Sequence, residues 1–299
     1  MKILIISGFL GAGKTTFIKA LQRHTQKEYV ILENEYGDAD IDTAVLQRDN
    51  MKVWELTEGC ICCSVKADFA NSVLTISNTL DPDYLIVEPS GVGMLSNIYT
   101  NIKKIQYARI RLLAPITLID FHSFQEYMDT FDAFYKDQII NAGRVLIAKG
   151  EKAPPEKLLA VGEMLKELNP KGEIVTDHYE KQPDWWWQSV LTTGWDEDRG
   201  IVSSAEDRLN MSSLSIKDVS YDDFEQFQWD MTALMDGRLG KIYRIKGLLP
   251  IEGQWAKVDV VNKQYNLEIW DAQERARIVV IGRDLDRSSI VTLFKNRSK

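Results

Sequence analysis

One stretch near the N-terminus has the residue types and the spacing of a phosphate-binding loop. Residues 8–15 read Gly-Phe-Leu-Gly-Ala-Gly-Lys-Thr, which fits G-x-x-x-x-G-K-[ST] between an apolar run and a helical pattern. Glycines let backbone N–H groups surround phosphate oxygens, to which the helix N-terminus adds its positive end. We expect Lys14 to contact the outer phosphates of a nucleotide and the Thr15 hydroxyl to bind Mg²⁺. The residues expected to bind the nucleotide here are Gly8, Gly11, Ala12, Gly13, Lys14, Thr15 and Thr16.

A second phosphate-side element follows the apolar run at residues 84–87, where the chain reads Glu88-Pro89-Ser90-Gly91. An acid at the end of a strand can hold a water bound to Mg²⁺ or orient the attacking water. The N–H group of Gly91 can donate to a γ-phosphate, so we expect Glu88 and Gly91 to act with Lys14 in catalysis. The alternatives are an ordinary glycine turn at residues 8–15 and a turn capped by Glu88 that starts a helix at Gly91.

All three cysteines of the chain fall within four residues, at Cys60, Cys62 and Cys63. Thiolates in a C-x-C-C pattern can converge on one soft cation, and a helix that begins nearby favours their ionised form. Zn²⁺ is the expected metal, with Co²⁺, Ni²⁺ or Cu⁺ as alternatives. The acidic segment at residues 33–42 offers carboxylates, of which we select Glu35 and Asp38 as further ligands of the soft metal. The alternatives are cysteines that pack beneath the nucleotide loop and an acidic loop that is merely solvated.

Strands and crossover helices must bring these residues together. Over the first 180 residues, short β-rich runs alternate with segments of helical period, which predicts an α/β fold with a mostly parallel sheet flanked by helices. The expected strands are residues 2–6, 29–32, 52–56, 84–87, 115–119, 144–148 and 173–176. Two helical faces are formed by Phe69, Val73, Ile76 and Leu80, and by Leu158, Val161, Leu165 and Leu168. We expect the strand before the cysteines and the strand before Glu88 to be neighbours in the sheet.

The pattern changes after about residue 193, where residues 194–200 are polar and bounded by glycines. They predict a linker or an irregular connection to a second, smaller α+β domain. We expect a helix capped by Ser220, strands near residues 241–245, 256–261, 265–270 and 277–281, and a last helix from Ser288. The predicted domains are a phosphate-loop domain that contains the cysteine loop, at residues 1–193, and an α+β domain at residues 200–299.

Composition limits the classes of function. The 299 residues carry a formal net charge of −8, which disfavours long-range attraction to nucleic acid or to anionic lipid. No apolar run approaches the ~20 residues that cross a bilayer, and the run at residues 1–6 is too short for a signal peptide. Cysteines confined to one loop make a poor disulfide framework. We therefore expect a folded protein of the cytoplasm that binds a small nucleotide.

Four motifs stand in a fixed order: G-F-L-G-A-G-K-T-T, N-E-Y-G-D-A-D-I-D, G-C-I-C-C-S and E-P-S-G. Together they resemble those of the CobW-type P-loop GTPases, relatives of the nickel-insertion GTPases UreG and HypB. Residues 243–247 and 278–286 resemble the C-terminal domain of that family. The resemblance implies a slow, Mg²⁺-dependent GTPase that carries a transition metal, zinc or else cobalt or nickel, to a client metalloprotein. It assigns the three cysteines to that metal, and a homodimer is one arrangement it allows.

The family reads guanine with N-K-x-D, and at that place this chain has Ala148-Lys149-Gly150-Glu151. Lys149 can lie along the base and Glu151 can accept from the guanine N1 and N2 groups, so we expect GTP to bind better than ATP by a reduced margin. His178 follows the strand at 173–176 and could meet the base or the metal loop, or be a surface residue. The three tryptophans at 185–187 are expected to pack at the domain junction.

Two other functions stay open on the sequence alone. A P-loop kinase that phosphorylates a small molecule would use the same phosphate loop, and its cysteine loop would be incidental. A nucleotide-regulated binding adaptor would show negligible turnover. Measuring turnover with and without Zn²⁺ separates these functions from the metal-delivering GTPase.

Overall fold

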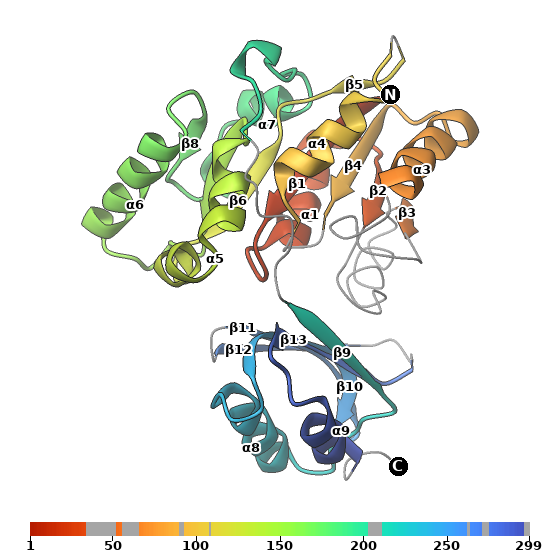
Figure 1. The fold of residues 1–299 in the computed structure, drawn as a ribbon, viewed down its shortest axis with the longest axis vertical. Coiled ribbons are helices and arrows are strands. Elements are labelled where there is room, and N and C mark those ends of the chain that lie inside the picture. The colour runs from red at the N-terminus through yellow and green to blue at the C-terminus, as the bar shows by residue number, and fades with distance from the viewer. Residues whose placement is uncertain are drawn as a thin grey trace. The chain divides into compact units, whose positions relative to one another are not determined.

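The structure is a computed structural model that describes residues 1–33, 52–55, 66–89, 93–107, 109–202, 211–261, 264–270 and 275–295 (Figure 1). The described residues form two compact units, one of residues up to 202 and one of residues from 211. The predicted domain limits, at residues 193 and 200, stay a prediction. Between them, the Trp195 N–H group donates to the Leu112 carbonyl at 3.2 Å, and the Arg199 guanidinium donates to Asn169 Oδ1 at 2.6 Å. Residues 195 and 199 are therefore hydrogen-bonded to the first unit.

The first unit is built on a parallel sheet. Its strands are β1 (Lys2–Gly8), β2 (Val30–Glu33), β3 (Lys52–Glu55), β4 (Tyr84–Glu88), β5 (Arg111–Leu112), β6 (Ile116–Asp120), β7 (Arg144–Ala148) and β8 (Glu173–Val175). Seven of them follow the order β3-β2-β4-β1-β6-β7-β8, and the short β5, which the sequence did not predict, pairs with β1. The predicted parallel α/β sheet is confirmed.

One predicted neighbour relation is wrong. We expected the strand before the cysteines, β3, to lie beside the Glu88 strand, β4, but β2 lies between them and pairs with both. The connection through the next helix passes over one strand of the sheet. Adjacency along the chain therefore did not decide adjacency in the sheet, because a crossover helix can skip a strand.

Helices cover both faces of this sheet (Figure 1). They are α1 (Lys14–Thr25), α3 (Lys66–Thr79), α4 (Leu95–Lys103), α5 (Phe124–Ile140), α6 (Pro155–Leu168) and α7 (Asp184–Val190), with 3₁₀ turns η1 (Tyr179–Lys181) and η2 (Glu197–Arg199). Leu4 and Ile6 of β1 belong to the core cluster shared with α1 and α7, and all four residues from Ile3 to Ile6 are at most 1% exposed. A strand buried on both faces reads as a continuous apolar run, which is the pattern of a parallel sheet.

The predicted helical faces are confirmed only in part. Phe69, Val73 and Ile76 of α3 are buried as expected, but Leu80 lies beyond the end of the helix and is 48% exposed. In α6 only Leu165 of the predicted face is fully buried. Apolar spacing predicted where these helices lie, whereas their ends and depth of burial depended on neighbouring elements.

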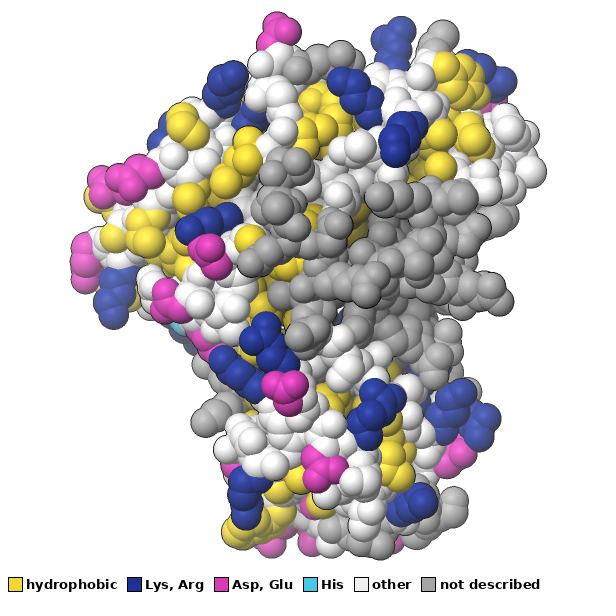
Figure 2. All heavy atoms as spheres, in the orientation of Figure 1, with side chains coloured by type: hydrophobic (Ala, Val, Ile, Leu, Met, Phe, Trp, Pro, Cys, Tyr) yellow, Lys and Arg dark blue, Asp and Glu magenta, His cyan; other side chains and the backbone are white. Residues whose placement is uncertain are grey.

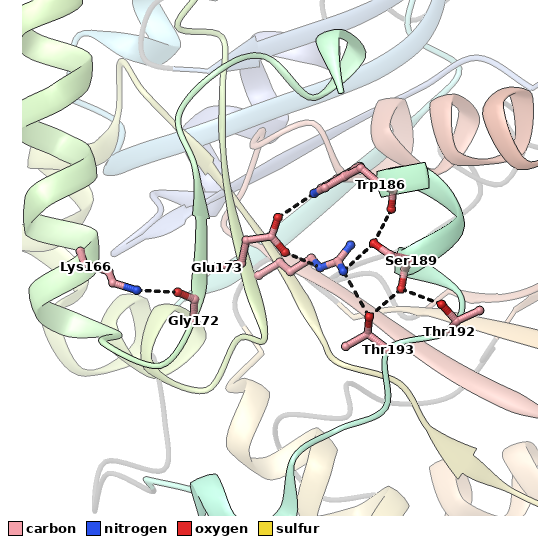
Figure 3. A network of polar contacts seen from close by, with 8 residues as sticks. Lys166, Gly172, Glu173, Trp186, Ser189, Thr192 and Thr193 are labelled. Carbon is pink, nitrogen blue, oxygen red and sulfur yellow. Dashed lines mark hydrogen bonds and ion pairs between the residues drawn. The ribbon is translucent and has the colours of Figure 1, made fainter. Parts of the chain in front are cut away.

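A polar network ties α7 to the strands β7 and β8 (Figure 3). The Arg144 guanidinium pairs with Glu173 at 2.8 Å and donates to Ser189 Oγ at 2.7 Å, and Trp186 Nε1 donates to the other oxygen of Glu173 at 2.7 Å. Thr193 accepts a further hydrogen bond from Arg144 at 3.2 Å. The network accounts for a buried arginine, since a buried charge needs paired partners.

The tryptophan prediction is wrong. Trp186 and Trp187 are 2% and 0% exposed within the core of the first unit, where the Trp187 ring stacks on Phe17 of α1 at 5.6 Å. Trp185 is 70% exposed. Successive residues of a helix point in different directions, so two of the three rings could enter the core of one domain while the third stays in solvent.

In the residues described from 211 onward, the second unit is a five-stranded antiparallel sheet with two helices. Its elements are β9 (Ser212–Lys217), α8 (Phe224–Met235), β10 (Lys241–Ile251), β11 (Gln254–Val261), β12 (Gln264–Ile269), β13 (Arg277–Arg283) and α9 (Arg287–Lys295), and the strand order is β12-β11-β10-β13-β9. Phe227 and Met231 of α8 and Phe294 of α9 share one core cluster with the strands. The predicted smaller α+β unit is confirmed.

Two details of the second unit differ from expectation. β9 was not predicted, and α8 is capped by Asp223, whose Oδ1 accepts from the Glu225 N–H group at 2.9 Å, instead of by Ser220. Both residue types are good N-caps, so position relative to the first helical turn decided between them. The last helix begins one residue before the predicted Ser288, at Arg287.

No helix in the described part of the chain is long and apolar enough to cross a membrane. Among the described residues, side chains of both charge signs lie on the face drawn in Figure 2.

Candidate nucleotide site

The predicted phosphate loop connects the end of β1 to the start of α1. Gly8 has φ +147°, and a Cβ atom there would lie 2.7 Å from the Leu118 carbonyl oxygen of β6. Gly13 has φ +94° and occupies the N-cap of α1. At Gly8 the neighbouring carbonyl leaves no room for a side chain. At Gly13 the left-handed backbone disfavours one, so both positions need glycine. The local sequence thus dictates the conformation of the loop.

Lys14 is the first residue of α1, and its side chain folds back across the loop. Its Nζ donates to the Gly8 carbonyl oxygen at 3.2 Å, and the residue is 7% exposed. The ammonium group therefore lies against the backbone that would surround a phosphate. All seven residues predicted to bind nucleotide here, from Gly8 to Thr16, lie in this strand-loop-helix segment.

Aromatic side chains of α5 pack against the phosphate loop. The Phe9 ring lies 4.4 Å from Phe131 and 4.7 Å from Tyr127, measured between centroids, and meets Tyr135 edge-on at 5.8 Å. The Tyr127 hydroxyl also donates to the Leu10 carbonyl at 3.4 Å. Each aromatic pair contributes roughly 0.5–1.5 kcal/mol beyond its buried area. The sequence did not indicate this support, because α5 is distant from the loop along the chain.

The second phosphate-side element meets the loop at the ends of β4 and β2. Thr15 Oγ1 donates to Glu88 Oε1 at 3.2 Å, and Glu88 is 6% exposed. Glu33, which ends β2, is the register partner of Glu88 and is 5% exposed. The Thr15 hydroxyl, the Glu88 carboxylate that it contacts and the buried carboxylate of Glu33 on the neighbouring strand are hard oxygen donors of the kind that bind a divalent cation. The predicted catalytic residue Gly91 lies outside the described residues.

Glu33 was not selected from the sequence, although a signal was present. It ends an apolar strand in the same way that Glu88 ends β4. In parallel strands the carboxyl ends meet at one edge of the sheet, so an acid at that position is a candidate for the site.

A second group of polar residues gathers at the ends of β6, β7 and β8. Lys149 follows β7 with φ +60°, and its Nζ pairs with Asp120 Oδ2 at 2.9 Å. Asp120 ends β6, is 4% exposed and also accepts from the His122 N–H group at 2.9 Å. Asp120 was not selected from the sequence, although it too is an acid at the end of an apolar strand.

Glu151 and His178 complete this group. Glu151 Oε1 lies 2.8 Å from His178 Nε2, and the two side chains are 50% and 21% exposed. Of the three alternatives for His178, the structure places it beside the predicted base-reading residue. Lys149 and Glu151, predicted to read guanine, both lie at the carboxyl end of β7.

The predicted soft-metal ligands Cys60, Cys62, Cys63, Glu35 and Asp38 lie outside the described residues. Within the described ranges, no group of three or more His, Cys, Asp or Glu side chains is placed to hold a metal ion. The metal site therefore stays a prediction.

Comparison with known proteins identifies the two units. The family described as CobW/HypB/UreG, nucleotide-binding domain, matches residues 2–176, and the family of the cobalamin synthesis protein cobW C-terminal domain matches residues 211–297. These two matches follow one another along the chain as the two compact units do.

Individual relatives are similar over almost the whole chain. The zinc chaperone YjiA of Escherichia coli is 25% identical over 323 aligned positions, which cover 99% of this chain and 98% of that protein. The zinc chaperone CobW of Sinorhizobium sp. is 24% identical, with coverage of 96% and 94%. The crystal structure of the Zn(II)-bound YjiA GTPase from E. coli aligns over 100% of this chain and 99% of its own, with 20% identity and a TM-score of 0.47.

Proposed function

The chain belongs to the CobW/HypB/UreG family, and we propose that it is a Mg²⁺-dependent GTPase whose nucleotide state controls the binding and delivery of a transition metal. The observation that carries the proposal is the contact of Thr15 with Glu88 beside Lys14, at the carboxyl edge of the parallel sheet. Ligands of open α/β sheets bind at this edge.

The phosphate chemistry follows from the residues around the loop. Lys14 would exchange its hydrogen bond to the Gly8 carbonyl for the outer phosphates and neutralise their charge. Backbone N–H groups at the start of α1 would donate to the same oxygens. Glu88, which accepts a hydrogen bond from Thr15, would orient a water for attack on the terminal phosphorus. The N–H group of Gly91 would donate to the γ-phosphate.

The oxygen donors fit Mg²⁺. Thr15 and Glu88 would hold it, the first through its hydroxyl and the second directly or through a water, while Glu33 adds a second buried negative charge. When bound, the ion would screen the phosphate charge that develops during transfer. In the structure the Thr15 hydroxyl donates to Glu88, so Glu88 already orients the group that would face the cation.

The base would be read at the ends of β6 to β8. Lys149, paired with the buried Asp120, would lie along the ring, and Glu151 would accept from the N1 and N2 groups of guanine. The asparagine of the usual motif is replaced by Ala148, so the margin of GTP over ATP would be reduced.

Zinc is the metal we propose first, because two relatives that align with nearly the whole chain are named zinc chaperones. Cys60, Cys62 and Cys63 would bind it, with Glu35 and Asp38 as further ligands. Thiolates are the ligands that Zn²⁺ and Co²⁺ share, so Co²⁺ can report on the same site. The cargo would pass to a client metalloprotein.

The first test uses reduced, metal-free protein titrated with Co²⁺. A thiolate-to-cobalt charge-transfer band should appear in the parent and vanish in Cys62→Ser and in Cys63→Ser, while Ser64→Ala, next in sequence, should keep it. Repeating the titration with GDP and with a non-hydrolysable GTP analogue should give affinities that differ by roughly 5- to 150-fold. Absence of the band would overturn the metal site, and equal affinities would overturn nucleotide control.

Measuring turnover tests the enzyme class. Phosphate release from GTP, with and without Zn²⁺, is expected to be slow and dependent on Mg²⁺. Transfer of the phosphoryl group to a small molecule would instead identify a kinase. Tight GTP binding with no release would identify a binding adaptor.

A further inference from the structure

We propose that His178 is a positioning residue for nucleotide selectivity, because it holds the Glu151 carboxylate in the orientation that accepts from guanine and rejects adenine. The inference rests on the proposed function, in which Glu151 reads the base. It adds a residue outside the A-K-G-E segment, brought in by the neighbouring strand β8.

Glu151 needs an external support. Its side chain is half exposed, and its carboxylate pairs with His178, at 2.8 Å between Oε1 and Nε2. A glutamate has one more rotatable bond than the aspartate of the usual N-K-x-D motif, so more of its orientations point away from the base. A hydrogen bond that removes this freedom before the nucleotide arrives lowers the entropy cost of binding.

His178 itself is fixed by three contacts. Its Nδ1 accepts from the backbone N–H group of Glu180 at 3.3 Å, and its ring stacks on Tyr179 with centroids 4.3 Å apart. Tyr179 is 4% exposed and meets Phe17 of α1 edge-on at 5.1 Å. The third contact is the pair with Glu151. The imidazole is therefore anchored to the core of the first unit.

The backbone contact determines the tautomer. Because Nδ1 accepts a hydrogen bond, it carries no proton in this arrangement, and the proton of the neutral ring is on Nε2. Nε2 then donates to Glu151 Oε1. The carboxylate keeps acceptor capacity on both oxygens, which leaves it able to accept from the N1 and N2 groups of guanine.

The same fixed carboxylate would repel adenine. Adenine presents a lone pair at N1 where guanine presents a donor, so a carboxylate held there faces an acceptor and gains nothing. A carboxylate released from His178 could turn into solvent and tolerate either base. Selectivity by rejection requires a rigid group, and His178 supplies the rigidity.

The test compares the affinities of Mg²⁺-GDP and Mg²⁺-ADP by equilibrium titration. His178→Ala should weaken GDP binding by about two- to fivefold, because Glu151 must then be ordered when the base binds and the lost pair is partly exposed, and it should leave ADP binding unchanged or slightly stronger. His178→Gln keeps an amide donor near the position of Nε2 and should retain most of the preference. In a Glu151→Ala background, His178→Ala should have no further effect on the ratio.

His24→Ala provides the matched control. His24 pairs with the carboxylate of Glu180 at 2.9 Å, whereas His178 accepts from the backbone N–H group of Glu180, so the variant removes a histidine–glutamate pair next to His178 and leaves the pair of His178 with Glu151 in place. Its loss should leave the ratio of GDP to ADP affinity unchanged. Equal loss of GDP and ADP affinity in His178→Ala would show a structural role and overturn the inference.

The outcomes also separate the inference from the proposed function. A parent protein that prefers GDP, with a ratio unchanged in His178→Ala, overturns the positioning role and leaves guanine reading by Glu151 intact. A parent protein that binds GDP no better than ADP overturns guanine reading itself, and the role of His178 falls with it.

Discussion

At the phosphate end of the first unit, Lys14 is 7% exposed, and the motif runs over eight consecutive residues from the end of one strand to the start of one helix. At the base end, Lys149 and Glu151 have side chains 45% and 50% exposed, and of their partners Asp120 ends β6 and His178 follows β8. The first end is local and buried, and the second is assembled from distant segments near the surface.

The difference has an energetic consequence. Polar contacts in a buried site are little screened by water, whereas exposed ion pairs contribute only about 0–1 kcal/mol. Changes at the phosphate end should therefore affect binding and turnover strongly. Changes at the base end should adjust which nucleotide binds, with smaller effects on whether one binds.

The largest expected effect is that of Lys14→Ala. It removes the cation that would neutralise the outer phosphates, and we expect the rate of GTP hydrolysis to fall by about 100- to 1,000-fold. Phosphate release under saturating Mg²⁺ measures this. Lys19→Ala, further along the same helix, should keep the parent rate. A Lys14→Ala protein that hydrolyses GTP and ATP as fast as the parent would remove the phosphate-loop assignment.

Glu88→Gln should have the next largest effect. The variant keeps the size of the side chain but loses the negative charge beside Thr15. We therefore expect turnover to fall by about 10- to 100-fold and the Mg²⁺ concentration that gives half the maximal rate to rise. A Mg²⁺ titration of the initial rate tests both. Glu28→Gln, two residues before β2 begins, is the control. An unchanged Mg²⁺ dependence in Glu88→Gln would contradict the cation assignment.

At the base end, Asp120→Ala should act through Lys149. Without its partner the half-exposed Lys149 side chain becomes mobile. We therefore expect the affinity for GDP, measured by equilibrium titration, to fall by about fivefold. Asp120→Asn, which still accepts from the His122 N–H group, should lose less. If Asp120→Ala removed nucleotide binding altogether, the two ends would not differ as described.

The smallest expected effect is the pH dependence of stability that comes from a buried carboxyl group of the first unit, Asp137. Burial raises the pKa of Asp137 above its usual value, although hydrogen bonds from Ser96 and Asn141 favour its ionised form. The folded state then holds this proton more tightly than the unfolded chain. The contribution of Asp137 to stability is therefore present below the usual pKa of ~4 and is lost as pH rises through the raised value.

Asp137→Asn should remove this dependence. The difference in free energy of unfolding between the parent and the variant, from urea titrations followed by tryptophan fluorescence, should move in favour of the variant between pH 4 and pH 7. A difference that stays constant over this range would show that Asp137 does not titrate as its burial implies.

Much of the phosphate end could be predicted from the sequence. Glycines with positive φ, a lysine at the first helical position and an apolar strand are needed within eight residues, so local geometry leaves few alternatives. The parallel sheet also followed from local information, because buried strands read as apolar runs between helical segments. The two families matched by the chain agree with the motifs that were recognised.

The sequence alone did not determine which distant residues meet. The contacts of Lys149 with Asp120 and of Glu151 with His178, and the pairing of Glu33 with Glu88, all depend on the order β3-β2-β4-β1-β6-β7-β8. That order results from how the crossover helices pack on the sheet, which also placed β2 between the two strands expected to be neighbours. Contacts between strand ends are set by this long-range packing, and no spacing along the chain encodes it, so only the tertiary structure decided them.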